Sequence, residues 1–319
     1  MRVLLTGGAG FIGSHLLAAL LERGDEVVCL DNFDPFYPRE CKERNLAEVG
    51  ESSRLRVVEG DVCDAQALEA VFVEQCPELV LHLAAKAGVR PSIADPAGYL
   101  NANACGTLNV LQMAVNYGVG RVIFTSSSSV YGGLTRLPYS EDQNTLRPLS
   151  PYAASKVAAE VFCHALHHLH KLPIVILRLF TVYGPRQRPD LAISKFARLI
   201  EQGAPLPLFG DGQSSRDYTH VNDVVRGILA AADSNLQYAT INLGRSDPVT
   251  LLELVEALGH VVGQQPKVEF GPVQAGDMLH TYADISLANR LLRWEPEVEL
   301  AEGLRDFVEW QRRHEKGAG

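Results

Sequence analysis

One stretch decides the fold of this chain: Val3-Leu-Leu-Thr-Gly7-Gly8-Ala9-Gly10-Phe11-Ile12-Gly13. An apolar strand pattern leads into glycines spaced three residues apart, and a helical pattern follows from residue 14 to residue 21. This order points backbone N–H groups and the positive end of a helix at one spot. A pyrophosphate fits there because glycines let it approach the backbone closely, although tight turns also use glycine for steric reasons alone.

An acidic residue after the second predicted strand strengthens this interpretation. The strand at 26–30 is followed by Asp31, which lies about 20 positions beyond the glycines, where an acid holds the adenosine ribose of a dinucleotide. The alternative is a solvated acid in the turn before Asn32. The combined pattern predicts NAD as the cofactor, and Asp31 favours NAD over NADP because it would repel a 2′-phosphate.

Apolar strands alternate with helical stretches along the chain. The later predicted strands are 55–58, 79–83, 122–125 and 174–179, and the predicted helices lie near 65–75, 98–117 and 151–170. This alternation predicts an α/β fold, a Rossmann-like doubly wound parallel sheet. Beyond residue 180, turns rich in proline and glycine indicate a smaller C-terminal lobe that binds substrate, and residues 240–244 predict one more buried strand. We expect an NAD-binding domain of residues 1–180 plus about 216–244, and a substrate-binding lobe of about 181–215 plus 245–319.

Composition narrows the classes of partner. The chain has 319 residues, 46% hydrophobic residues and a formal net charge of −9, which argues against nucleic acid as a main partner. We expect no targeting leader, because Met1 and Arg2 lead straight into the first strand, and no membrane span, because apolar runs are short. The six cysteines lack metal-ligand spacing and indicate a reducing, cytoplasmic location.

Four histidines between residues 164 and 170 raise the alternative of a metal site. They crowd one predicted helix and lack partner carboxylates at ligand spacing, which is typical of a packed or solvated helix face. We therefore expect no metal.

Tyr152 and Lys156 form a candidate acid–base pair. They are four residues apart at the start of a predicted helix, so their side chains share one face. The unperturbed pKa of tyrosine is about 10, and a neighbouring ammonium group favours the phenolate that a base near neutral pH requires. This spacing also arises by chance, but here it follows the fifth predicted strand, which ends in the run Ser126-Ser127-Ser128-Ser129. A hydroxyl from this run, for which we choose Ser127, can bind the same substrate oxygen as Tyr152; the alternative is a plain polar loop.

Taken together, these motifs resemble the extended short-chain dehydrogenase/reductase superfamily and, within it, the NAD-dependent nucleotide-sugar epimerases. The resemblance spans nearly the whole chain and also rests on Asp61-Val62, Leu83-Ala84-Ala85, Asn103-x-x-Gly106-Thr107 and the stretch Arg216 to Val224. It implies adenine binding by Asp61 and Val62, binding of the nicotinamide ribose by Lys156, and a homodimer formed through the helices near 100–117 and 152–170. The NAD-binding residues that it implies are Gly7, Gly10, Phe11, Ile12, Gly13, Asp31, Asn32, Asp61, Val62, Leu83, Ala84, Ala85, Asn103, Tyr152 and Lys156.

The loop from Ser127 to Val130 narrows the reaction. Related dehydratases carry an Asp-Glu pair before the Val-Tyr-Gly motif, because elimination of water needs an acid and a base beyond the tyrosine. Related UDP-glucuronate decarboxylases place a glutamate before that valine, and 3,5-epimerases use a cysteine acid. This chain has Ser128 and Ser129 instead. The resemblance therefore implies 4-epimerisation of a UDP-sugar, in which Tyr152 accepts the 4-hydroxyl proton while NAD takes and returns the C4 hydride.

Residues 178–192 resemble UDP-glucuronate 4-epimerases, as do Asp31 to Tyr37 and Ala87 to Ser92. We assign the C6 carboxylate to Arg188, because a planar guanidinium makes paired, charge-assisted hydrogen bonds with a carboxylate. The alternative is that Arg186 and Arg188 border a loop or bind the diphosphate. The resemblance implies substrate contacts for Arg90, Ser127, Ser128, Thr181, Arg186, Arg188, Arg216 and Asp277.

Other interpretations stay open. A 4-epimerase of UDP-glucose and UDP-galactose, or of a UDP-N-acetylhexosamine, has the same catalytic residues, although UDP-galactose epimerases usually place an arginine at Gln274 and an asparagine at Thr181. A UDP-glucuronate decarboxylase is disfavoured by the missing glutamate. A non-catalytic NAD-binding regulator is disfavoured because the Ser127, Tyr152 and Lys156 set is intact.

Overall fold

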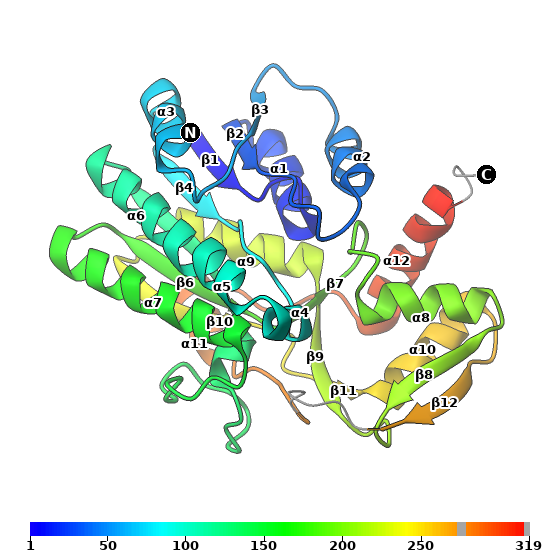
Figure 1. Cartoon of the computed structure of the whole chain (residues 1–319). Coiled ribbons are helices and arrows are strands. Elements are labelled where there is room, and N and C mark those ends of the chain that lie inside the picture. Colours follow the sequence, from blue (N-terminus) through cyan, green and yellow to red (C-terminus); the bar gives the residue numbers. More distant parts are fainter. Residues whose placement is uncertain (273–278, 316–319) are drawn as a thin grey trace.

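The computed structural model describes residues 1–272 and 279–315. Its central element is a parallel seven-stranded sheet in the order β10-β6-β5-β4-β1-β2-β3 (Figure 1). The strand order reverses between β1 and β4, and doubly wound sheets bind ligands at the carboxyl edge of that point. The predicted Rossmann-like fold is confirmed. The strands are β1 (Arg2–Thr6), β2 (Glu26–Asp31), β3 (Leu55–Glu59), β4 (Leu79–His82), β5 (Arg121–Ser127), β6 (Ile174–Leu179) and β10 (Tyr238–Leu243).

Helices cover both faces of this sheet, because successive side chains of a strand point to opposite faces. Val3 and Leu5 of β1 belong to one apolar core with helices on their face, and Leu4 belongs to a second core on the other face. The first core includes α1 (Phe11–Arg23), α9 (Val221–Asp233) and α11 (Ser286–Leu292). The second includes α3 (Ala65–Gln75), α6 (Gly106–Asn116) and α7 (Pro151–His170).

The predicted helices at 65–75 and 151–170 are confirmed, but the region at 98–117 is not one continuous α-helix. It is divided into α5 (Pro96–Leu100), a π-helical turn η1 (Asn101–Cys105) and α6. Two further helices, α2 (Arg39–Val49) and α4 (Val89–Ala94), were not predicted. The sequence of α2 is dominated by charged residues, so it carries little of the apolar periodicity that reveals a helix.

A second lobe lies beside the large sheet (Figure 1). Its strand β9 (Ser215–His220) lies between β7 (Thr181–Tyr183) and β11 (Pro248–Thr250), and β8 (Pro205–Phe209) pairs in parallel with β12 (Lys267–Gly271). These strands share a core with α8 (Ala192–Glu201), α10 (Leu251–Val262) and α12 (Leu300–Glu315). The predicted return of the chain to the large sheet is confirmed, because β10 pairs with β6. The domain boundaries stay a prediction.

Three further predictions concern features outside the site. Within residues 1–272 and 279–315, no helix has both the length and the apolar character that a membrane crossing needs. The six cysteines are free thiols. In the described part of the chain, no group of His, Cys, Asp and Glu side chains is arranged to hold a metal ion. Among the clustered histidines, His167 stacks on Tyr238 with ring centres 4.9 Å apart.

Candidate active site

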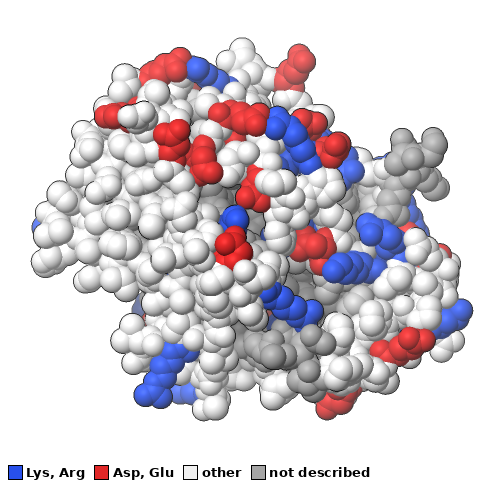
Figure 2. All heavy atoms as spheres, in the orientation of Figure 1, with Lys and Arg blue, Asp and Glu red and all other residues white. Residues whose placement is uncertain are grey.

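A cavity of about 1130 Å³ extends from the glycine turn along the carboxyl edge of the large sheet to the second lobe. It is lined by residues of the glycine turn after β1, of β5 and of α7 on one side, and by residues of β8 and α8 on the other. Figure 2 shows a hollow in this face of the molecule, with Lys and Arg side chains interspersed among Asp and Glu. This cavity brings together most of the residues that the sequence predicts for the site.

The glycine turn forms one end of the cavity. Gly7 adopts a φ of +74°, and a Cβ on Gly13 would lie only 2.1 Å from the carbonyl oxygen of Gly7, so both positions require glycine. At Gly10, in contrast, a Cβ would have only Gly7 O at 3.2 Å and the Tyr37 hydroxyl at 3.9 Å nearby, so it would project into the cavity. Helix α1 begins at Phe11 without a side-chain cap, which leaves its first N–H groups free to bind a phosphate.

Asp31 lies buried beside this turn at the end of β2. Its carboxylate accepts hydrogen bonds from the N–H groups of Phe33 at 2.9 Å and Ala9 at 3.2 Å, and forms a 3.1 Å ion pair with Lys42 of α2. Sequence analysis missed Lys42, because nothing distinguishes this lysine among the charged residues of α2. The positive charge of Lys42 offsets the negative charge of Asp31. The preference for NAD over NADP therefore stays a prediction.

Asp61 and Val62 follow β3 and line the same end of the cavity. Asp61 accepts hydrogen bonds from the N–H of Cys63 at 2.8 Å and the amide of Asn32 at 2.9 Å. Partial burial raises the pKa of Asp61, but these hydrogen bonds outweigh that effect and hold its pKa below the usual range. The wall is continued by the predicted residues Phe11, Ile12, Leu83, Ala84 and Ala85.

Asn103 is not among the described residues that line the cavity, and the cofactor contact predicted for it stays a prediction. Its buried side-chain amide accepts from the N–H of Lys86 at 2.8 Å and donates to Lys86 O and Ser155 Oγ, both at 2.9 Å. Both ends of the amide form hydrogen bonds within the protein, so Asn103 holds the Lys86 loop against α7.

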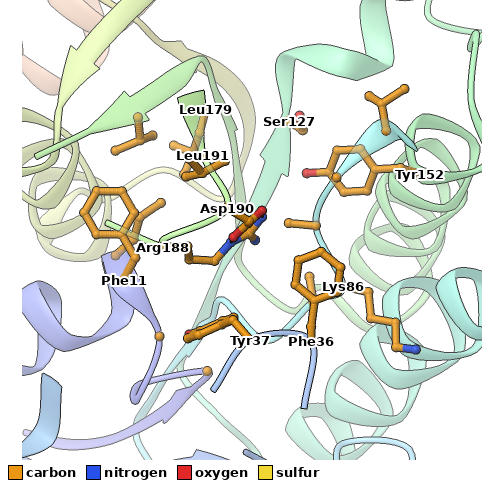
Figure 3. A pocket seen from close by; sticks show the side chains of 18 of the residues that line it. Phe11, Phe36, Tyr37, Lys86, Ser127, Tyr152, Leu179, Arg188, Asp190 and Leu191 are labelled. Atoms are coloured by element: carbon orange, nitrogen blue, oxygen red, sulfur yellow. Dashed lines mark hydrogen bonds and ion pairs between the residues drawn. The ribbon is translucent and has the colours of Figure 1, made fainter. Parts of the chain in front are cut away.

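Helix α7 presents Tyr152 and Lys156 to the cavity, one turn apart. The helix begins after Ser150, whose hydroxyl accepts from the N–H of Ala153 at 3.1 Å. Figure 3 shows the Tyr152 hydroxyl pointing toward Ser127 at the end of β5. The structure thus brings Ser127, Tyr152 and Lys156 together; their catalytic roles stay a prediction.

Burial shifts the pKa values of both Tyr152 and Lys156. Burial raises the pKa of Tyr152, and the hydrogen bond with Ser127 and the charge of Arg188 oppose that rise only in part. Burial also lowers the pKa of Lys156 to about 8. Its ammonium donates to the carbonyl oxygen of Thr125 at 2.9 Å. A tyrosine base at neutral pH therefore requires further positive charge nearby, which an oxidised nicotinamide ring supplies when bound.

A buried ion pair that sequence analysis missed lies one helical turn beyond Lys156. Glu160 accepts from Arg178 of β6 at 3.0 and 2.7 Å, and from the hydroxyl of Ser126 at 2.5 Å. Glu160 therefore links α7 to β6 through Arg178 and to β5 through Ser126, the residue before Ser127. A glutamate in a helix and an arginine in the next strand carry no sequence signal that they meet.

Arg188 projects into the middle of the cavity, where Figure 3 shows its guanidinium beside Asp190. Its Nε and Nη2 atoms donate to the two carboxylate oxygens of Asp190 at 2.9 and 2.8 Å. The guanidinium also lies over the ring of Phe36, 5.1 Å from its centre. The arginine assigned to a sugar carboxylate thus already has a carboxylate partner.

Arg186 is absent from the described residues that line the cavity. Its Nε pairs at 3.0 Å with Glu48 of α2, and Glu48 also contacts Trp310 at 3.0 Å and His314 at 3.0 Å in α12. The backbone of Arg186 has a φ of +61°, so the loop turns sharply there and directs Arg186 and Arg188 differently. The substrate contact predicted for Arg186 stays a prediction; its side chain pairs with Glu48 of α2, which in turn contacts α12.

The remaining predicted substrate residues are distributed along the cavity. Ser128, Thr181, Arg90 and Arg216 all line it. The Arg90 guanidinium lies 5.3 Å from the ring centre of Phe209 in β8. Asp277 lies outside the described residues.

A Rossmann-type sheet with a Tyr-Lys pair and a serine at its carboxyl edge defines a protein of the extended short-chain dehydrogenase/reductase class. Comparison with known protein families identifies the family within this class. The chain belongs to the NAD dependent epimerase/dehydratase family, whose model matches residues 3–244.

Similar proteins cover almost the entire chain. A UDP-glucuronate 4-epimerase of Thermodesulfobacterium geofontis is 39% identical over 310 residues, which are 97% of this chain and 95% of that protein. The crystal structure of a UDP-glucuronic acid 4-epimerase from Bacillus cereus, in complex with UDP-glucuronic acid and NAD, has a TM-score of 0.93 at 35% identity and covers 98% of this chain and 100% of that one. A UDP-glucose 4-epimerase from Thermotoga maritima, with UDP-glucose, has a TM-score of 0.91 at 32% identity over 98% and 99% of the two chains.

Proposed function

We propose that this chain is an NAD-dependent isomerase that converts UDP-glucuronate to UDP-galacturonate by epimerisation at C4. The observation that carries the proposal is the position of Tyr152 and Ser127 within one cavity that the glycine turn lines at one end and Arg216 lines in the second lobe. A volume of about 1130 Å³ accommodates a dinucleotide and a nucleotide sugar together. The relatives named for UDP-glucuronate support the choice of substrate.

NAD fits the end of the cavity formed by the glycine turn. Gly10 leaves open the space that a Cβ would fill, and α1 begins there without a side-chain cap, so backbone N–H groups can hold the pyrophosphate. We assign Asp31 and Asn32 to the adenosine ribose, Asp61 and Val62 to the adenine, and Lys156 to the nicotinamide ribose. When bound, NAD supplies the oxidation at C4 and its reversal, because it accepts a hydride and gives it back.

Tyr152 is assigned as the base for the 4-hydroxyl group. Lys156 keeps positive charge on the same helix face, since a pKa of about 8 leaves it largely protonated at pH 7. Ser127 shares a hydrogen bond with Tyr152 and orients the sugar oxygen toward the phenolate. After the ketosugar has turned its other face to the cofactor, Tyr152 returns the proton to the C4 oxygen.

A uronate substrate poses one chemical difficulty. Oxidation at C4 makes a β-keto acid, which loses carbon dioxide readily, so the carboxylate must be held out of alignment for cleavage. The stretch from Ser127 to Val130 offers the hydroxyls of Ser128 and Ser129 and contains no carboxylic acid that could assist decarboxylation. We assign Ser128, Thr181 and Arg188 to the sugar and its carboxylate.

Product analysis tests this function. The NAD-loaded protein is incubated with UDP-glucuronate, and the nucleotide sugars are separated and identified by mass. UDP-galacturonate is expected as the product, whereas a UDP-pentose would refute the proposal and favour a decarboxylase.

UDP-glucose and UDP-galactose are the second candidate substrates. The observation in their favour is the Arg188–Asp190 ion pair, which leaves the guanidinium already occupied and suits a sugar without a carboxylate. Initial rates measured side by side with UDP-glucuronate and UDP-glucose decide between the two. A higher kcat/KM for UDP-glucuronate is expected.

We also propose a homodimer in a reducing cytoplasm. Helix α7 exposes apolar side chains, with Val161 55%, Phe162 37% and Leu169 70% exposed, and it packs against α6. Two copies related by a two-fold axis would bury these side chains. Light scattering on the wild type and on Val161→Asp tests the dimer, which the aspartate is expected to dissociate. The six free thiols support a reducing location.

A further inference from the structure

The ion pair between Arg188 and Asp190 reproduces the contact that a substrate carboxylate would make. Both residues line the cavity, and both oxygens of Asp190 are engaged, by Nε at 2.9 Å and by Nη2 at 2.8 Å. This paired arrangement is the one in which a guanidinium binds a sugar carboxylate most strongly. The Asp190 side chain is 35% exposed and that of Arg188 only 15%, so Asp190 is the partner that can leave.

Arg188 is held in place independently of Asp190. Its guanidinium lies over Phe36, 5.1 Å from the ring centre, and 6.0 Å from the ring centre of Tyr37. Its backbone carbonyl accepts from the hydroxyl of Ser194 in α8 at 2.9 Å. The cation therefore stays in the cavity when its carboxylate partner is exchanged.

We propose that Asp190 is a specificity-determining residue that competes with the C6 carboxylate of the substrate for the guanidinium of Arg188. This inference rests on the proposed function. Exchange of one carboxylate for another keeps Arg188 paired at every stage, whereas release of the uronate would otherwise leave a largely buried charge alone. The ketosugar must leave its first orientation before it turns, so Asp190 lowers the cost of that release. A neutral sugar makes no such exchange.

The variant Asp190→Asn tests the competition, because it keeps the shape of the side chain and removes its charge. The dissociation constants of UDP-glucuronate and UDP-glucose are measured by calorimetry on NAD-loaded protein that also carries Tyr152→Phe, so that turnover does not disturb the titration. The Kd of UDP-glucuronate is expected to fall about five-fold, the effect of one partly exposed ion pair, and that of UDP-glucose to stay within about two-fold.

Two further variants separate charge from structure. Asp190→Glu keeps the carboxylate and is expected to bind both ligands as the Tyr152→Phe parent does. Asp233→Asn removes an Asp–Arg pair outside the cavity, where Asp233 lies 2.9 Å from Arg23, and is expected to change neither constant. Equal tightening of both ligands in Asp190→Asn, or no tightening, overturns the role of Asp190.

Turnover by the wild type is measured separately, so that the two proposals fail in different ways. If the wild type epimerises UDP-glucuronate but Asp190→Asn binds it no more tightly, the function stands and the competition is refuted. If the parent does not bind UDP-glucuronate, both are refuted.

Discussion

The ammonium group of Lys156 donates a 2.9 Å hydrogen bond to the carbonyl oxygen of Thr125. This contact ties the first turns of α7 to the end of β5. Tyr152 lies one turn before Lys156, and Ser127 lies two residues after Thr125, so one backbone contact sets the relative position of all three candidate catalytic residues. The acid–base geometry is therefore a consequence of how this helix docks on the carboxyl edge of the sheet.

Replacement of Tyr152 by phenylalanine removes the proposed base while keeping the ring. We expect kcat to fall by about 10³-fold, within the range that general base catalysis contributes, with little change in thermal stability. Steady-state rates and melting curves check this. Tyr117→Phe, at a tyrosine bonded to Glu69 on the surface, is the matched control and should keep wild-type activity. Wild-type turnover by Tyr152→Phe would refute the assignment.

Lys156→Met should stabilise the fold at neutral pH while abolishing activity. Burial lowers the Lys156 pKa from 10.5 to about 8, so the cost of its charge is fully present below pH 8 and disappears as the pH rises toward 10.5. We expect the variant to exceed the wild type by up to about 3 kcal/mol in free energy of unfolding at pH 7, and the gap to close above pH 8. Urea unfolding across this pH range measures it. A variant less stable than the wild type at pH 7 contradicts the expectation.

His82 should make the fold sensitive to acid. Its buried ring lies between the hydroxyls of Thr6 and Thr107 at 2.7 and 3.0 Å, and burial lowers its pKa from 6.5 to about 3. The unfolded chain therefore binds one more proton than the native state between these values, and stability falls as the pH drops below 6.5. Between pH 7 and pH 5 the wild type should lose about 2 kcal/mol more than His82→Gln.

Chemical denaturation at the two pH values measures this difference. The exposed His260, replaced by glutamine, is the matched control and should follow the wild type. Equal acid sensitivity of the wild type and His82→Gln would show that the buried ring does not carry the effect.

Glu160→Gln should destabilise the protein strongly. It leaves the Arg178 guanidinium buried without its carboxylate partner, which costs about 3–5 kcal/mol in free energy of unfolding. Adding Arg178→Met should restore much of the loss, because the second change removes the unpaired charge. A double variant no more stable than Glu160→Gln would mean that the ion pair is not the cause.

Alanine substitutions of Arg186 and Arg188 should change the KM for UDP-glucuronate to different extents. Arg188→Ala removes a guanidinium from the cavity and is expected to raise the KM for UDP-glucuronate about ten-fold. Arg186→Ala removes only the pair with Glu48, so its KM should stay within about two-fold while stability falls by about 1 kcal/mol. Equal increases of KM would place Arg186 in the substrate site after all.

The sequence predicts the sheet well because its strands and glycine turn are local patterns. The apolar runs and Gly7 to Gly13 each lie within a few residues, and the alternation of strands with helices predicts a parallel, doubly wound sheet. The side-chain partners depend on contacts between distant segments. Lys42 meets Asp31 across two elements, and Glu160 meets Arg178 from helix to strand. No local pattern encodes either meeting.

The loop that carries the arginines shows the same limit at short range. Arg186 and Arg188 look equivalent in the sequence, yet the positive φ at Arg186 separates their directions. Asp190 is two residues from Arg188, and only the turn of the chain brings their side chains into a paired contact. The carboxylate-binding role that residue type predicts for this loop stays a prediction, and backbone conformation decides which side chain reaches the cavity.

The fate of the C4 hydrogen tests the central claim most directly. UDP-glucuronate labelled with deuterium at C4 is incubated with the NAD-loaded protein, and the product is analysed by mass spectrometry and NMR. The proposed mechanism predicts UDP-galacturonate that retains the deuterium at C4, because the same hydrogen leaves and returns. A UDP-pentose, or UDP-galacturonate that has lost the label to solvent, would contradict it.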